Sequence, residues 1–555
     1  MRTRSRRSFI ILIAIIALLV GLAAGESISD LQWLAILAAA WAVLWITLRP
    51  RLSLNVPITA RSSVTLAAFL VSVLLVAMVQ AFRTQVVLGG AIGRRVGIDP
   101  ATGDVLGNPR LAGGGLRVRR GTINDRHGIP LAESLAEEDR YRRLVADPAA
   151  SEITGYYSPL LYGASDVEAA RDNDLSGMVG ASSLERAIAE FAGRERTGVD
   201  VTLTIDLGLQ RLAHSLLDGK RGAAIVLDAA TGAVLTMASA PSLDPNTLNI
   251  TRAGERETAI TYWNSLVADP AAPLLLRPTS ALLTPGSVFK VITAAAAIDQ
   301  GVAQPDDYFD DAGEIEIDGR VLVEANRPDD TITSWSLTEA IGWSLNVVFA
   351  RIGLLVGASG MRQAAKAWGF GEEIPFDLPV ETSLLETTPG NLDSQVALAE
   401  TAFGQGQLLV TPMQMALVAA GIANGGTIMR PYLVASISEP DGTVLWQASP
   451  RAWRTPVRPA TADAVADMMV WAAEQGGILA AGIPGVRVGG KTGTAETSIV
   501  DANNAWYIGF ANDGTRNLAI CVVVEGEGTG GTIALPIAHE LMVAALAADL
   551  SSSPA

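Results

Sequence analysis

Long apolar stretches open the chain and set its first predicted elements. Residues 9–24, 31–48 and 64–82 are almost uninterrupted apolar runs, each close to the length that crosses a bilayer as an α-helix. We therefore predict about three membrane-spanning helices, which together form a membrane anchor over residues 1–86. A cleaved signal peptide is the alternative for the first run, because small residues follow it at positions 21–25.

The charges between these runs predict the direction of the chain. Arginines precede the first run and fill the loop between the second and third, whereas the loop at residues 25–30 has acidic residues and no basic one. Cytoplasmic loops carry the excess of Lys and Arg. The N-terminus is therefore expected in the cytoplasm, and everything after Arg83 outside it.

After the membrane anchor the pattern changes twice. Residues 87–118 are rich in Gly and Arg without a helical or strand period, which predicts an extended linker. Residues 119–197 are polar with short apolar pieces, which predicts a small domain that we call the pedestal. We thus assign residues 87–197 to linker and pedestal, and residues 198–550 to a third, larger domain.

The larger domain mixes strand and helix patterns. A strand-like segment from Val199 is followed by an amphipathic helix at Leu209–Leu217, and then by strands at Gly222–Leu227 and Ala233–Ser239 that read as a hairpin. Ala-rich helical segments follow, and strands return near the C-terminus. This order predicts an α/β (α+β) fold with helices packed on a sheet.

Charge and composition exclude several classes of function. A net charge of −16 leaves no basic face for a phosphate backbone, so we expect no nucleic-acid partner. The three histidines, His127, His214 and His539, lie in different segments, so a His-based triad, a metal site or a cofactor is not expected. The single cysteine, Cys521, lies in an apolar run and is expected to be a buried strand thiol.

Lysine usage points to one segment as a candidate site. Only four of the 41 basic residues are lysine, and one of these, Lys290, follows Ser287 by three positions at a predicted helix N-terminus, with Gly301 as the stop. A serine hydroxyl needs a base, and a lysine can be one if it is desolvated enough to be neutral, whereas an arginine cannot. Backbone N–H groups at a helix N-terminus can in addition stabilise an oxyanion.

Two further short motifs follow in order. Ser344 and Asn346 lie on a predicted helix at residues 337–352, where their short polar groups could point into a cleft. Lys491, followed by Thr492, Gly493 and Thr494, lies on a predicted glycine-flanked strand that an extended peptide could join at its edge. Each motif alone occurs by chance, and ordinary helix polarity or a surface lysine would explain it. Together they form the motif set of penicillin-binding proteins and β-lactamases.

With these residues the sequence resembles class B penicillin-binding proteins from Arg120 to Ala538. The segment Arg120–Gly128 is similar to the family's pedestal signature R-G-x-I-x-D-R-N-G, with His127 in place of the usual asparagine. Further segments continue the resemblance, at residues 203–210, 241–246, 404–412, 423–426 and 506–511. The resemblance implies a transpeptidase domain at residues 198–550 and a serine acyltransferase that cross-links peptidoglycan.

The family's roles carry over where residues match. The resemblance implies that Ser287 attacks the carbonyl between the two terminal D-alanines of a stem peptide, with Lys290 as general base. It implies that Ser344 passes the proton to the leaving amine and that Asn346 positions Lys290 and the substrate. Lys491, Thr492, Gly493 and Thr494 would bind the substrate, with the N–H groups of Ser287 and Thr494 as the oxyanion hole. Penicillins and other β-lactams would acylate Ser287.

Some features depart from the family or leave alternatives open. The family usually has one membrane span rather than three, and Val288 stands where threonine is usual. No glycosyltransferase segment is recognised, so the resemblance implies a polytopic glycosyltransferase partner of the shape, elongation, division and sporulation family. A D,D-carboxypeptidase or endopeptidase would share the nucleophile, and a β-lactam-sensing membrane receptor is a third possibility. The resemblance is equally consistent with a role in cell elongation and with a role in cell division.

Overall fold

The computed structural model describes residues 16–20, 22, 28–50, 53, 57–88, 97–98, 105–106, 115–178, 196–496 and 502–548. They fall into two compact units. The first holds the N-terminal helices, and the second holds nearly all of the chain from Arg119 onward.

Two apolar helices dominate the described part of the first unit. α2 spans Asp30–Leu48, and α3 spans Ile58–Phe82 and continues as a π-helical turn, η2, at Arg83–Val87. The helices lie side by side, with the rings of Trp41 and Phe69 meeting edge to face at 5.9 Å between centroids. They occupy the second and third predicted spans, whereas most of the first predicted span lies outside the described residues.

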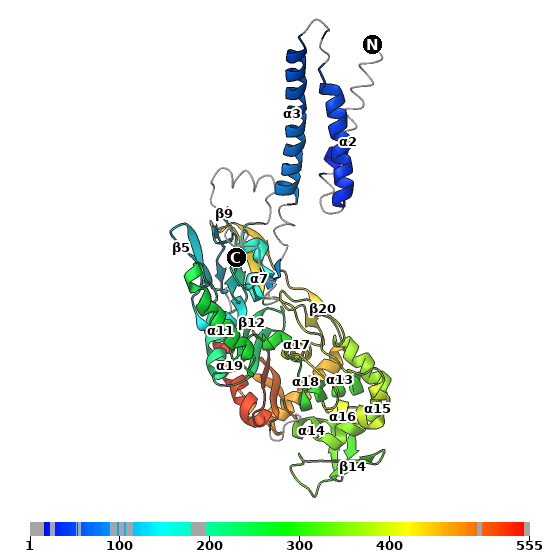
Figure 1. Cartoon of the computed structure of the whole chain (residues 1–555). Helices are drawn as coiled ribbons and strands as arrows, with labels where there is room; N and C mark the ends of the chain where they lie inside the picture. Colours follow the sequence, from blue (N-terminus) through cyan, green and yellow to red (C-terminus); the bar gives the residue numbers. More distant parts are fainter. Residues whose placement is uncertain are drawn as a thin grey trace. The chain divides into compact units, whose positions relative to one another are not determined.

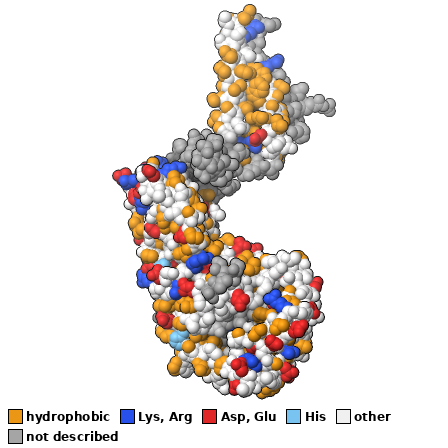
Figure 2. All heavy atoms as spheres, turned by 60° about the horizontal axis from the view of Figure 1, so that its bottom comes forward, with side chains coloured by type: hydrophobic (Ala, Val, Ile, Leu, Met, Phe, Trp, Pro, Cys, Tyr) orange, Lys and Arg blue, Asp and Glu red, His pale blue; other side chains and the backbone are white. Residues whose placement is uncertain are grey.

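α3 is long and apolar enough to cross a membrane. It has 25 residues, reaches a mean hydropathy of 2.4, and leaves most of its apolar side chains exposed. Figure 2 shows these hydrophobic side chains gathered along the N-terminal helices, in contrast to the mixed surface of the second unit. A helix of this kind is stable when lipid covers it.

A six-stranded sheet forms one part of the second unit. Its strands in spatial order are β19 (Val444–Gln447), β18 (Val434–Ser438), β10 (Asp200–Leu203), β4 (Ile123–Asn124), β5 (Pro130–Glu137) and β6 (Arg140–Val145). β4 and β10 run parallel, with Ile123 opposite Val201, and the other neighbours are antiparallel. Strands of the predicted pedestal therefore share a sheet with strands of the predicted transpeptidase domain, and the boundary at residue 197 stays a prediction.

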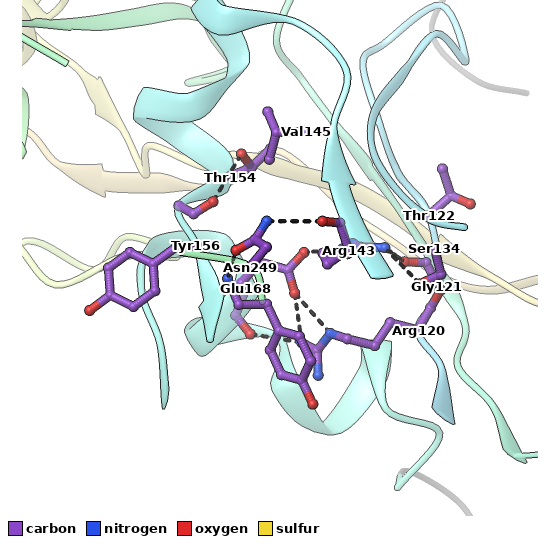
Figure 3. Close-up of polar contacts among 12 residues, drawn as sticks. Arg120, Gly121, Thr122, Ser134, Arg143, Val145, Thr154, Tyr156, Glu168 and Asn249 are labelled. Atoms are coloured by element: carbon purple, nitrogen blue, oxygen red, sulfur yellow. Dashed lines mark hydrogen bonds and ion pairs between the residues drawn. The ribbon is translucent and has the colours of Figure 1, made fainter. Parts of the chain in front are cut away.

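A buried ion cluster fixes the pedestal end of this sheet (Figure 3). Glu168 is fully buried and accepts hydrogen bonds from Arg143 and Arg120, with 2.7 Å between its Oε2 and Arg120 Nη2. The guanidinium of Arg120 also stacks on the ring of Tyr157 at 3.9 Å. Burial alone would raise the pKa of Glu168, but the two arginines hold it below its usual value. Arg120, the first residue of the pedestal signature, thus has a structural role here.

A five-stranded antiparallel sheet forms the other part of the second unit. Its spatial order is β12 (Val234–Ala240), β11 (Gly222–Asp228), β23 (Asn517–Val524), β22 (Asn504–Asn512) and β21 (Arg487–Ala495). All of its strands are almost entirely buried. The predicted hairpin of β11 and β12 is confirmed, as is the buried thiol of Cys521, whose pKa burial raises.

Helices cover both faces of the five-stranded sheet. Successive residues of β11 alternate between two cores: Ala224 and Val226 meet α10 (Leu207–Leu216) and α19 (Leu535–Ala547), whereas Ile225 belongs to the core on the other face. That second core contains α13 (Lys290–Asp299), α17 (Pro412–Ala423) and α18 (Pro459–Glu474). The predicted fold, an antiparallel sheet packed with helices, is confirmed.

Three more helices gather around α13 (Figure 1). They are α14 (Leu337–Trp343), α15 (Asn346–Ala367) and α16 (Gln395–Ala402), and the hairpin of β14 (Glu314–Ile317) and β15 (Arg320–Val323) precedes them in the chain. This arrangement brings the start of α13, the junction of α14 with α15, and the edge strand β21 together.

Candidate active site

Ser287 lies in a short turn that opens a helix, as predicted. The 3-10 turn η6, at Gly286–Phe289, runs directly into α13, which ends at Asp299. Gly286 has a left-handed backbone (φ 59°), and its N–H donates to the carbonyl of Gly404 at 2.9 Å. Val288 and Phe289 are fully buried, whereas Ser287 is half-buried. The turn is therefore held by its neighbours, and Ser287 keeps part of its surface exposed.

Lys290 is fully buried, and its amine has three partners. Its Nζ donates to the carbonyl of Ser344 at 2.6 Å, to Asn346 Oδ1 at 2.8 Å and to Ser344 Oγ at 3.3 Å. These bonds use all three donors of an ammonium. None of the hydrogen bonds in the described part of the chain joins Lys290 Nζ to Ser287 Oγ. The amine is thus held by the turn at Ser344 to Asn346, and Lys290 follows Ser287 by three residues in the sequence.

The predicted single helix at residues 337–352 is wrong. α14 ends at Trp343, Ser344 adopts a left-handed conformation (φ 65°, ψ 39°), and α15 begins at Asn346. A left-handed residue ends an α-helix, and this position is usually glycine, so the serine gave no sequence signal for the break. The break turns the carbonyl and hydroxyl of Ser344 toward the amine of Lys290.

Lys491 completes the cluster from the five-stranded sheet. It lies on β21 with 2% of its surface exposed, and its Nζ donates to Ser344 Oγ at 2.8 Å and to the carbonyl of Thr492 at 2.9 Å. The hydroxyl of Ser344 therefore lies between the amines of Lys290 and Lys491. The structure brings four of the predicted residues, Lys290, Ser344, Asn346 and Lys491, into one hydrogen-bonded group.

The strand β21 passes close to the Ser287 turn. A Cβ at Gly493 would lie 2.7 Å from the carbonyl of Pro285, and one at Gly286 would lie 2.8 Å from the carbonyl of Thr494. Glycine is needed at both positions for this approach. Within the described residues β21 pairs with β22 alone, so its other edge faces the turn. Thr492 and Thr494 are half-buried along this strand.

Burial and charge make the two lysines unusual. Burial, and then the charge of Lys491, lower the pKa of Lys290 well below its ordinary range, while the charge of Glu324 acts in the opposite direction. Burial lowers the pKa of Lys491 to about 7. Both shifts make the uncharged amine more accessible near neutral pH than it is in an exposed lysine, and Lys491 keeps its charged form in part. In contrast, Lys220 forms an ion pair with Glu527 at 3.2 Å and Lys366 is exposed, so the two motif lysines are the two buried ones.

Three residues that support the site were not predicted from the sequence. Glu324 and Asn326 lie in the loop after β15 and hydrogen-bond to the turn at Ser344, and Phe349 places its ring 5.4 Å from Lys290 Nζ. None lies in a short motif, and their placement depends on tertiary contacts. Gly404 lies in a segment similar to the family, but only the structure shows its contact with Gly286.

Comparisons with known proteins identify the family. The family model described as the penicillin binding protein transpeptidase domain matches residues 222–543, and that of the penicillin binding protein A dimerisation domain matches residues 120–201. The peptidoglycan D,D-transpeptidase PbpA of Mycolicibacterium smegmatis is 36% identical over 438 residues, which cover 76% of this chain and 87% of the relative. PbpA of Mycobacterium tuberculosis is 34% identical over 441 residues, with the same two shares.

Solved structures give the same result. Penicillin-binding protein A from M. tuberculosis, as a ceftriaxone acyl-enzyme complex, matches with a TM-score of 0.71 and 33% identity, covering 78% of this chain and 99% of that chain. Its penicillin G acyl-enzyme complex matches with a TM-score of 0.69 and 33% identity, covering 77% of this chain and 100% of that chain. With a transpeptidase model matching more than half of its residues, this chain belongs to the class B penicillin-binding proteins.

Proposed function

We propose that this protein is a membrane-anchored D,D-transpeptidase that cross-links peptidoglycan stem peptides through an acyl-enzyme on Ser287. The observation that carries the proposal is the group of Lys290, Ser344, Asn346 and Lys491 beside the Ser287 turn, at the edge of β21. The relatives named as D,D-transpeptidases and the β-lactam acyl-enzymes of a similar protein support it.

The first half of the reaction forms the acyl-enzyme. The uncharged amine of Lys290 takes the proton of Ser287 Oγ as the oxygen attacks the carbonyl between the two terminal D-alanines. The N–H groups of Ser287 and Thr494 stabilise the oxyanion, where the loss of one donor typically costs about 2.7–4 kcal/mol of barrier. The C–N bond then breaks. Ser344 Oγ donates a proton to the leaving D-alanine amine and recovers one from the lysines on either side of it.

The second half transfers the acyl group. An amine of a neighbouring stem peptide attacks the ester carbonyl and loses a proton to the same relay, and Ser287 Oγ leaves with a proton as the cross-link forms. The substrate backbone joins the edge of β21, where Thr492 and Thr494 offer hydroxyls and Lys491 a positive charge for a carboxylate. A β-lactam acylates Ser287 as in the first half of the reaction and remains bound as the acyl-enzyme.

The location and partner follow from the same proposal. We infer a multi-pass anchor that includes α2 and α3, with the catalytic domain outside the cytoplasm because arginines flank the N-terminal run and fill the loop before α3. Glycan polymerisation is assigned to a polytopic glycosyltransferase of the shape, elongation, division and sporulation family. Residues 1–86, the linker and pedestal to residue 197 and the domain from 198 to 550 are the proposed divisions.

Labelling with a fluorescent penicillin tests the nucleophile. The wild-type protein is expected to form a covalent adduct that survives denaturing gel electrophoresis, and Ser287→Ala is expected to lose it while melting at the wild-type temperature. Ser265→Ala, at an exposed serine of α11 (Arg256–Ala268), is the matched control and keeps the label. A stable Ser287→Ala protein that still forms the adduct would remove Ser287 from its role.

Product analysis separates transfer from trimming. The protein is supplied with nascent glycan made by a partner polymerase, and the muropeptides are separated by mass spectrometry. Cross-linked dimers support the transpeptidase. Free D-alanine without dimers would assign the protein to the D,D-carboxypeptidases instead.

A further inference from the structure

A loop outside the three motifs holds the turn that carries Ser344. The loop follows β15 and contains Glu324, a residue that is 9% exposed. Its Oε1 accepts the N–H groups of Ala325 and Asn326, both at 3.0 Å, and its Oε2 accepts the N–H of Val347 at 2.8 Å. The carboxylate is therefore directed by its own loop onto the first turn of α15.

The same loop also binds the carbonyl of the left-handed serine. Asn326 Nδ2 donates to the carbonyl of Ser344 at 3.0 Å, and this oxygen is also the acceptor of Lys290 Nζ at 2.6 Å. Glu324 and Asn326 thus hold the two ends of the turn, at Val347 and Ser344. A left-handed serine costs about 1–2 kcal/mol, so such a turn persists only where its surroundings fix it.

The charge of Glu324 bears on the buried lysines. Lys290 begins α13, which packs against α14, α15 and α18, and the charged groups whose fields act on Lys290 are Lys491 and Glu324. If Lys290 is neutral and Lys491 protonated, the carboxylate and the ammonium cancel, and the buried site has no net charge. An opposite charge nearby offsets part of the cost of burying each of them.

We propose that Glu324 is a positioning residue of the active site, which holds the turn at Ser344 to Asn346 and balances the charge of the two buried lysines. This inference rests on the proposed roles of Ser287 and Lys290. Glu324 does not touch the reacting atoms. It acts through Lys290 and through the position of Ser344, so its effect is expected both on the rate of acylation and on the pH at which acylation begins.

The pH profile of acylation tests the charge. The second-order rate of labelling by a fluorescent penicillin is measured from pH 5 to 9 with the full chain in detergent. Because the negative charge of Glu324 raises the pKa of Lys290, Glu324→Gln is expected to move the acid limb to lower pH. The plateau rate is expected to fall as well, because an amide cannot accept all three N–H groups.

Two further variants test the direction in which the acid limb moves. Lys491→Met removes a positive charge that lowers the pKa of Lys290, so its acid limb is expected to move the opposite way, to higher pH. Glu339→Gln is the matched control, because Glu339 caps the start of α14 through Ser336 and has no part in the field at Lys290. Its limb is expected to stay at the wild-type pH.

The outcomes decide the proposal independently of the nucleophile. A folded Glu324→Gln protein with a wild-type acid limb, or a Glu339→Gln protein with the same shift, would overturn it while Ser287→Ala still lost its label. If Glu324→Gln does not fold, Asn326→Ala loosens the exposed end of the loop with no change of charge. Its acylation is expected to fall several-fold with the limb unmoved, and a wild-type rate would overturn the positioning role.

Discussion

Replacing Lys290 by arginine separates a positive charge from a base. Both side chains can donate to the carbonyl of Ser344 and to Asn346 Oδ1, but only lysine can become neutral near pH 7. At pH 7.5 an ordinary lysine, with a pKa of about 10.4, is neutral in roughly one molecule in a thousand. Burial and Lys491 lower the pKa of Lys290 and so raise the fraction of molecules in which its amine is neutral. Arginine is neutral in about one molecule in 100,000 or fewer.

The expected effect of Lys290→Arg is therefore a loss of acylation rate near the full contribution of a general base, about 10²- to 10⁴-fold. The rate is measured by stopped-flow or gel labelling with a fluorescent penicillin at pH 7.5. Because the site is fully buried, the larger guanidinium also costs about 1–3 kcal/mol of stability, so a melting curve accompanies each rate. Lys220→Arg, at the surface ion pair with Glu527, is the matched control and is expected to leave both quantities unchanged.

A second variant controls for the larger size of the guanidinium. Lys290→Met is unbranched, similar in length and unable to act as a base, and it is expected to lose acylation to the same extent as Lys290→Arg. If a folded Lys290→Arg protein reacts within tenfold of the wild type, a fixed charge is sufficient and the general-base argument fails. If Lys290→Met does so, neither the charge nor the base is needed.

Further predictions concern the scaffold of the site. Glu168→Gln leaves two arginines without their buried partner and is expected to lower the free energy of unfolding by about 3–5 kcal/mol. Asp172→Asn, at a half-exposed partner of Arg120, is expected to lower it by about 1 kcal/mol or less. Urea melts compare the two variants, and equal losses would contradict the role of the cluster. Gly404→Ala places a Cβ against the carbonyl of Gly286 and is expected to slow penicillin labelling strongly. Gly371→Ala is the control, because Gly371 has a similar positive φ but open space around it, and this variant is expected to affect stability alone. Equal labelling rates of the two variants would contradict the role of the contact between Gly404 and Gly286.

Local patterns predicted the elements that carry Ser287, Lys290 and Lys491. The turn into α13 begins at Gly286, Gly301 follows the end of that helix, and β21 is marked by glycines that the close approach of another backbone requires. These signals act over a few residues, so the sequence contains them. The six-stranded sheet is different. Its central pairing joins Ile123 to Val201, and a local pattern shows a strand but not its partner.

The break before α15 could not be predicted for a related reason. A chain that needs a left-handed residue usually has glycine there, but glycine has no hydroxyl to place between two amines. Ser344 therefore keeps a conformation that its own side chain disfavours, and the fold holds it with bonds from Lys290, Asn326 and Lys491. All of these partners are distant in sequence. The signal for the turn is thus spread over α13, the loop after β15 and β21, and the groups that stabilise this turn include those that would perform the chemistry.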